Sequence, residues 1–133
     1  MKRILTGVIV IICSLSAVSH SQEKRVNSLP CGEDGTQAEA NACARRDSQK
    51  ADAEMNAVYD RLMTELAGYG SKDQQRLRRA QATWFQYRDA NCESEASIYE
   101  GGSIHPAVYY SCLAVVTRER ARRLEEFLAA TRQ

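Results

Sequence analysis

The cysteines are the residues of this 133-residue sequence whose chemistry is easiest to specify. Cys13 lies in an apolar N-terminal run, and four more follow at Cys31, Cys43, Cys92 and Cys112. A zinc site is disfavoured, because no Cys-x-x-Cys pair occurs and the chain has only two histidines. Four cysteines in an exported chain instead predict two disulfides, which persist in an oxidising compartment. Three pairings are possible, and we favour Cys31–Cys43 with Cys92–Cys112 because each pair flanks a turn region.

Groups suited to nucleophilic or acid–base catalysis are scarce. No Gly-rich phosphate loop, His-Glu-x-x-His helix or Gly-x-Ser-x-Gly elbow is present. His105 has no obvious nucleophile near it except Ser103, so we interpret it as a surface-loop histidine. Carboxylates near the C-terminus alternate with arginines, as is typical of a solvated helix face. These residues are Glu119, Glu125 and Glu126 with Arg118, Arg120, Arg122 and Arg123. We therefore expect that the protein is not an enzyme and that it binds no cofactor and no metal.

A second group of polar side chains lies in register with the apolar positions of two expected helices. These residues are Asp52, Asn56 and Tyr59 on the first helix, and Gln81, Trp84 and Arg88 on the second. Spacings of three and four residues place each set on one helix face. A buried polar group left without a partner costs about 1–3 kcal/mol. We therefore predict an interhelical network in which Arg88 meets Asp52 or a nearby carbonyl, and the simplest role of that network is to fix helix register.

The first helix that must carry these residues begins after a turn at residues 32–35. Thr36 followed by Glu39 is a reciprocal capping pattern. Apolar residues then recur at three- and four-residue steps and mark one face. They are Met55, Val58, Tyr59, Leu62 and Leu66. Gly68 and Gly70 are expected to end the helix.

Two further helices are expected. Ser71 with Gln74 predicts a second capping pair, and the pattern that follows dissolves after Glu95. The face of this helix that is expected to pack comprises Leu77, Ala80, Trp84, Tyr87 and Asn91. Arg76, Arg78, Arg79 and Asp89 are expected to be exposed to solvent. Residues 97–106 predict a loop, and Pro106 suits the first turn of the last helix. That helix carries Tyr109, Cys112, Leu113, Val116, Leu124 and Phe127.

The expected fold is all-α, a small bundle in which two long helices form a hairpin and a C-terminal helix packs across them, with two disulfides.

The N-terminus has the pattern of a secretory signal peptide. Lys2 and Arg3 precede an apolar run that is shorter than the roughly 20 residues needed to span a bilayer. Cleavage before His20, after Ala17-Val18-Ser19, is favoured, and cleavage after Ser19-His20-Ser21 is the alternative. A lipoprotein signal ending at Cys13 is disfavoured, because Ile12 occupies the position where such a signal has a small residue. An uncleaved membrane anchor is equally disfavoured. We therefore expect a signal peptide at 1–19, a flexible leader at 20–30, a helical domain at 31–130, and a periplasmic or secreted protein without stable membrane insertion.

The charge balance excludes one class of partner. The chain has 18 Lys and Arg against 17 Asp and Glu, and its formal net charge is +1. Removing the first 19 residues with their two cations leaves 114 residues and a net charge of −1. A nucleic-acid binder usually carries a clear basic excess, so no nucleic-acid partner is expected.

Three segments of the sequence resemble the LprI-type lysozyme inhibitor domain. Residues 52–59 (DAEMNAVY) resemble its D-x-x-L-N-x-x-Y element, with Met55 in place of the usual Leu. Residues 80–92 (AQATWFQYRDANC) resemble its A-Q-x-x-W-x-x-Y-R-D-x-x-C signature. The closing stretch is matched by Gly101-Gly102-Ser103, Cys112, Thr117-x-x-Arg120 and Leu124. The resemblance covers roughly residues 31–124 and implies a small exported helical protein, bridged by cysteines, in a family named for lysozyme inhibition.

Two functional hypotheses follow. In the first, the protein occludes the cleft of a lysozyme, where such hydrolases hold two carboxylates. The candidate binding loop contains Gly101, Gly102, Ser103 and His105, because glycines permit close backbone approach and the other two side chains can donate hydrogen bonds. The same glycines also suit a plain connection between two helices. In the second hypothesis, the protein is a periplasmic helical binding module for another envelope enzyme, a toxin or an assembly, and the dense charge on its helices serves that contact.

Overall fold

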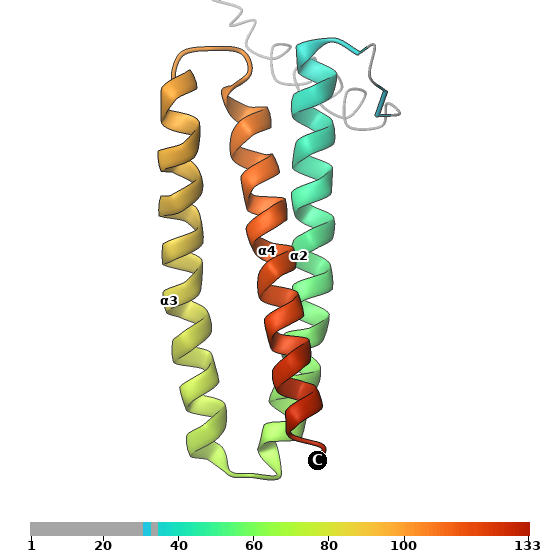
Figure 1. The fold of residues 1–133 in the computed structure, drawn as a ribbon, viewed down its shortest axis with the longest axis vertical. Coiled ribbons are helices and arrows are strands. Elements are labelled where there is room, and N and C mark those ends of the chain that lie inside the picture. Colours follow the sequence, from blue (N-terminus) through green and yellow to red (C-terminus); the bar gives the residue numbers. More distant parts are fainter. Residues whose placement is uncertain (1–30, 33–34) are drawn as a thin grey trace, which may run out of the picture.

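The described residues form three long helices. The computed structural model describes residues 31–32 and 35–133, so the signal peptide expected at 1–19 and the leader expected at 20–30 lie outside them. The helices are α2 (Gln37–Ala67), α3 (Ser71–Ala96) and α4 (His105–Ala130), and a short 3-10 turn, η1 (Ser97–Tyr99), follows α3 (Figure 1). No strand occurs within these described ranges. The all-α fold class is therefore confirmed.

The start of α2 follows the predicted capping pattern. The Thr36 backbone N–H donates to Glu39 Oε2 at 2.6 Å, and the Glu39 N–H donates to Thr36 Oγ1 at 3.3 Å. Two backbone donors that the first helical turn leaves unpaired are thereby satisfied.

Removing this cap should weaken the helix measurably. Thr36→Ala should lower the free energy of unfolding by about 1 kcal/mol, because the cap hydroxyl is lost. Urea denaturation followed by circular dichroism measures the change. Thr64→Ala is the matched control, since the Thr64 hydroxyl bonds only the carbonyl of Asp60 within the same helix. An equal loss in both variants would contradict a capping role.

The predicted capping pair at the start of α3 is wrong. Gly70 is the cap residue, its φ of 126° makes the turn between α2 and α3, and no side chain caps the helix there. Ser71 is already inside the first helical turn for this reason. Gln74 instead donates from Nε2 to the Met63 carbonyl oxygen at 2.8 Å, which ties α3 to the last turns of α2. Pro106 lies in the first turn of α4, as predicted.

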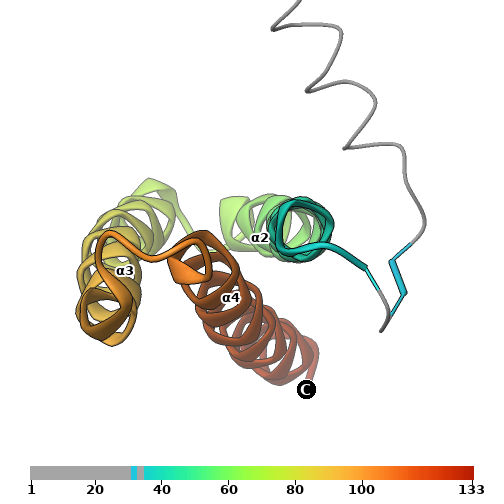
Figure 2. The same ribbon diagram turned by 90° about the horizontal axis from the view of Figure 1, so that it is seen from above.

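The three helices lie at the corners of a triangle when viewed along the bundle (Figure 2). Helices α2 and α3 are consecutive antiparallel neighbours, yet the most extensive packing is between α2 and α4. Helix α3 contacts α4 more than it contacts α2. The C-terminal helix therefore runs along α2 and forms the support against which α3 packs.

The core consists of one long cluster and one short cluster. The long cluster is made of Met55, Val58, Leu62, Leu66, Leu77, Leu124 and Leu128. The short cluster surrounds the Cys92–Cys112 bridge and includes Leu113. Both predicted disulfide pairings are confirmed, Cys31–Cys43 with Cα atoms 5.7 Å apart and Cys92–Cys112 with Cα atoms 5.5 Å apart.

The predicted apolar stripe of α3 is partly wrong. Tyr87 is 60% exposed and Ala80 is exposed, although both were assigned to the packing face. The buried positions are Leu77, Gln81, Arg88, Cys92 and Ala96. The packing face includes two polar residues, so a search for apolar periodicity selects a neighbouring face. Likewise Phe127 of α4 is 45% exposed, and the next residue, Leu128, is buried in its place.

An ion pair joins the first half of α2 to the middle of α4. Arg118 Nη1 donates to Asp47 Oδ2 at 3.0 Å, and its Nη2 donates to the other carboxylate oxygen. This hydrogen-bonded guanidinium holds the pKa of the Asp47 carboxyl below its ordinary value. Both side chains are about half exposed, so the pair contributes about 0.2–1 kcal/mol.

The pair should therefore make stability depend on pH in the acid range. A carboxyl whose folded pKa is lowered stabilises the fold above its unfolded pKa of about 3.9, and the contribution is lost as pH falls through the folded pKa. Asp47→Asn should be less stable than the wild type near neutral pH, and this difference should vanish in acid. Urea midpoints of both proteins measured from about pH 7 to about pH 2 test the expectation. A difference that stays constant over that range would contradict it.

Candidate functional site

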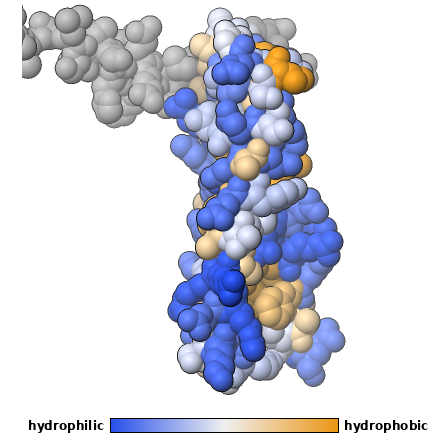
Figure 3. Space-filling model, turned by 90° about the vertical axis from the view of Figure 1, so that its left-hand side faces the viewer, coloured by the Kyte–Doolittle hydropathy of each residue, from blue (hydrophilic) through white to orange (hydrophobic). Residues whose placement is uncertain are grey.

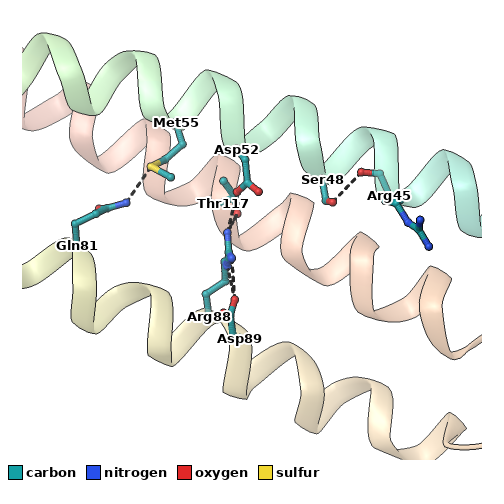
Figure 4. A network of polar contacts seen from close by, with 8 residues as sticks. All are labelled: Arg45, Ser48, Asp52, Met55, Gln81, Arg88, Asp89 and Thr117. Atoms are coloured by element: carbon teal, nitrogen blue, oxygen red, sulfur yellow. Dashed lines mark hydrogen bonds and ion pairs between the residues drawn. The ribbon is translucent and has the colours of Figure 1, made fainter. Parts of the chain in front are cut away.

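Arg88 of α3 has polar partners on more than one helix, although it is only 9% exposed. Its Nη1 donates to Asp52 Oδ1 of α2 at 2.8 Å and lies 3.4 Å from Thr117 Oγ1 of α4. Its Nε donates to Asp89 Oδ1 at 2.8 Å. Figure 4 shows the guanidinium between the three helices, with these partners around it. One side chain thus links all three helices of the bundle.

A second group of contacts continues from Arg88 toward the lower part of the bundle. Gln81 Nε2 lies 3.0 Å from the sulfur of Met55 on α2, and Gln81 Oε1 accepts from Arg120 Nε of α4 at 3.0 Å (Figure 4 shows the first contact). The Trp84 ring contacts two guanidinium groups, those of Arg88 at 5.3 Å and of Arg120 at 5.8 Å from the ring centroid. Cation–π contacts of this kind favour a cation over an aromatic face, and more strongly where water is excluded.

Not all residues named for this network lie in it. The structure brings Arg88, Asp52, Gln81 and Trp84 into one set of contacts. Asn56, in contrast, is exposed on α2. Tyr59 is half-buried and packs against the long apolar cluster.

Three members of the network, Asp89, Thr117 and Arg120, were not predicted from the sequence. Arg120 was assigned to a solvated arginine–glutamate face, and this is wrong, because it is half-buried and bonded to Gln81. Thr117 is fully buried. A signal for both exists in the sequence, since Thr117 and Arg120 continue the three- and four-residue spacing from Leu113 to Leu124. The carboxylates of the network accept hydrogen bonds from an arginine. The network is therefore better suited to holding the helices in place than to acid–base catalysis.

The second candidate site is the α3–α4 loop, which connects the end of α3 to the start of α4. Gly101 has a φ of 75°, a conformation that favours glycine, and a Cβ on Gly102 would lie only 3.0 Å from the Tyr99 carbonyl oxygen. Asn41 of α2 donates from Nδ2 to the Ser103 carbonyl oxygen at 2.9 Å. Ser103 is exposed, and His105 is half-buried at the start of α4. The loop is thus held from α2 and presents Ser103 to solvent.

An apolar groove of about 480 Å³ lies beside this loop. Its walls come from the end of α3, the loop and the first half of α4. The lining residues are Glu95, Ile104, Ala107, Val108, Ser111, Cys112, Val115 and Val116. Of these, Ile104 is 43% exposed and Val115 is 65% exposed. Figure 3 shows the most hydrophobic surface on the α3 side at this end of the bundle.

One acidic residue, Glu95, lines the groove. Glu93, Glu95 and Glu100 are exposed around the last turn of α3 and the loop. Burial raises the pKa of the nearby Tyr109 hydroxyl, and the charges of Asp89 and Glu93 add to this effect. Clusters of His, Cys, Asp and Glu that could hold a metal ion do not occur in the described part of the chain. None of the helices described here has the length and apolarity needed to cross a bilayer.

A family model described as "Lysozyme inhibitor LprI" matches residues 30–124, which include the Arg88 network, the loop and the groove. The chain belongs to the LprI family. A relative from Rhizobium meliloti (strain 1021), an uncharacterized protein, is 32% identical over 108 residues, or 74% of this chain and 78% of the relative. The resemblance found in the sequence is therefore confirmed.

A solved structure supports the same fold for this LprI family member. The crystal structure of a DUF1311 family protein from Pseudomonas putida KT2440 matches it with a TM-score of 0.64 at 28% identity. The match covers 68% of this chain and 92% of that chain. The LprI family is named for inhibition and not for an enzymatic reaction, and the two disulfides fit a compartment outside the reducing cytosol.

Proposed function

We propose that this LprI family member is an exported, non-enzymatic inhibitor that binds a lysozyme and occludes its active-site cleft with the α3–α4 loop. The observation that carries the proposal is the family match over residues 30–124. Two disulfides and the expected signal peptide support action in the periplasm or outside the cell.

The loop end of the bundle is the surface we assign to the enzyme. A protein contact needs a desolvated apolar centre, and Ile104 and Val115 supply exposed apolar side chains in the groove. Ser103 adds a hydroxyl donor that can reach a cleft carboxylate. The carboxylate of Glu95 in the groove and that of the exposed Glu100 in the adjoining loop suit a basic enzyme, so local charge can add attraction beyond that of a net charge of −1.

The test is a wall-lysis assay in which the purified protein is titrated against several classes of lysozyme. Inhibition of at least one class at micromolar concentration is expected. Val115→Asp should weaken it at least tenfold, because a charge would be buried in the apolar centre of the contact. Ser103→Ala with His105→Ala should weaken it by a smaller factor.

Tyr87→Asp is the matched control, since Tyr87 is an exposed apolar residue in the middle of α3, away from the groove. It should leave inhibition unchanged. Equal effects of both aspartate variants would remove the loop end from the contact. Absence of inhibition of every lysozyme class would instead favour the other hypothesis, a binding module whose groove receives a different envelope protein.

A further inference from the structure

A second pocket lies at the opposite end of the bundle from the loop. It has a volume of about 300 Å³ and lies between the end of α2, the first turns of α3 and the second half of α4. Leu66, Leu77 and Leu124 from the three helices contribute its apolar lining, and Ala80 and Phe127 also line it. Figure 3 shows a small apolar area among hydrophilic side chains in the lower half of the α3 side.

The polar lining of this pocket is cationic. Arg76, Arg120 and Arg123 line it together with a single acid, Asp73. Arg76 is neutralised by Asp73, because its Nη1 lies 2.7 Å from the Asp73 carboxylate. Arg123 is 64% exposed and has only a long contact, 3.5 Å, with Glu126. The remaining positive charge in the pocket is therefore that of Arg120 and Arg123.

Arg120 is the most informative of these residues. Its Nε donates to Gln81 Oε1, a neutral oxygen, and no carboxylate in the described part of the chain forms an ion pair with it. Burial lowers the pKa of its guanidinium, which reflects the cost of removing that charge from water. An arginine has five N–H donors, so the terminal nitrogens retain donors that can meet a ligand. A half-buried cation without an anion, at the wall of a pocket, is a site suited to an anionic group.

We infer that this pocket binds a small anionic amphiphile, with its carboxylate or phosphate head on Arg120 and Arg123 and its apolar chain against Ala80 and Phe127. Planar guanidinium groups bind both kinds of head group through paired hydrogen bonds. A free inorganic anion would leave the Phe127 side chain, which is 45% exposed, uncovered. The volume lies at the lower end of the range for small-molecule sites, which fits a short chain. The site is remote from the α3–α4 loop and does not depend on the proposed inhibition.

The test uses monomeric decanoate as the probe, titrated into the purified protein by calorimetry and by amide chemical-shift mapping. Saturable binding of one decanoate is expected, with shifts at the ends of α2 and α4 and at the start of α3. Decyl phosphate should bind in the same place. Acetate, which lacks the chain, and decyltrimethylammonium, which has the opposite charge, should bind at least tenfold more weakly. Equal binding of decanoate and decyltrimethylammonium would overturn the inference.

Two variants test the pocket without changing the Arg88 network. Arg123→Gln should weaken decanoate binding several-fold, whereas Arg122→Gln, outside the pocket on the same helix, should not change it. Ala80→Trp should fill the pocket and abolish binding while all charges remain. Both variants should melt as the wild type does. Unaltered affinity in Ala80→Trp would overturn the inference, as would binding only to phosphatidylglycerol vesicles and not to monomeric decanoate, since that pattern would indicate a membrane surface.

Discussion

Replacing Arg88 by methionine should lower the free energy of unfolding by about 3 kcal/mol, because the change removes one member of a buried, charged network. Methionine retains much of the side-chain length, so lost polar contacts rather than a large cavity should dominate. Thr117 is fully buried and would lose its contact with the guanidinium. Asp52 and Asp89 are partly exposed and can regain water, which places the expected loss at the lower end of the range for buried ion pairs.

Urea denaturation measures the loss, and Arg79→Met provides the control. Arg79 lies on the same helix but is exposed, so its replacement should change stability by less than about 0.5 kcal/mol. A double-mutant cycle with Asp52→Asn should give a coupling energy of about 0.5–3 kcal/mol, since the two residues share a hydrogen bond. If Arg88→Met and Arg79→Met cost the same, the network would not contribute to stability.

The Arg88–Asp52 contact illustrates which parts of the structure the sequence could predict. Each residue shares a helix face with apolar neighbours at three- and four-residue spacing, and a polar group at such a position needs a partner. Local chemistry likewise predicted the Thr36 cap and the Cys92–Cys112 bridge, because each depends on residues near one turn. These features were therefore predictable before any helix was placed against another.

The rotation of α3 about its axis could not be predicted in the same way. Tyr87 is more apolar than Gln81, yet Gln81 is buried and Tyr87 is exposed. The reason is that Gln81 finds Met55 and Arg120 on the two other helices, so its burial depends on tertiary contacts. The partial burial of Arg120 was missed for the same reason, because it also depends on the contact with Gln81. The two pockets could not be predicted from the sequence either, because each requires side chains from elements that are distant in the sequence to lie on one surface.

Removing the Cys92–Cys112 bridge should have an effect as large as the loss of Arg88. Cys92→Ala with Cys112→Ala should lower the free energy of unfolding by about 3 kcal/mol, because the unfolded chain gains the entropy of a 20-residue loop. Both cysteines are buried in the short core cluster, so the lost sulfur contacts add to this loss. Thermal and urea denaturation of the double variant measure the change.

The Cys31–Cys43 bridge is a matched control that separates chain entropy from packing. It closes a loop of 12 residues, and the entropic model predicts effects of the two bridges that differ by only about 0.5 kcal/mol. Packing predicts a larger difference, because Cys31 is exposed ahead of α2 whereas the other bridge joins α3 to α4 within the core. We expect Cys31→Ala with Cys43→Ala to cost clearly less than Cys92→Ala with Cys112→Ala. Equal losses would mean that the buried bridge acts through the unfolded chain alone. A larger loss for the buried bridge should also weaken the lysozyme inhibition that we propose, since Cys112 lines the groove beside the α3–α4 loop.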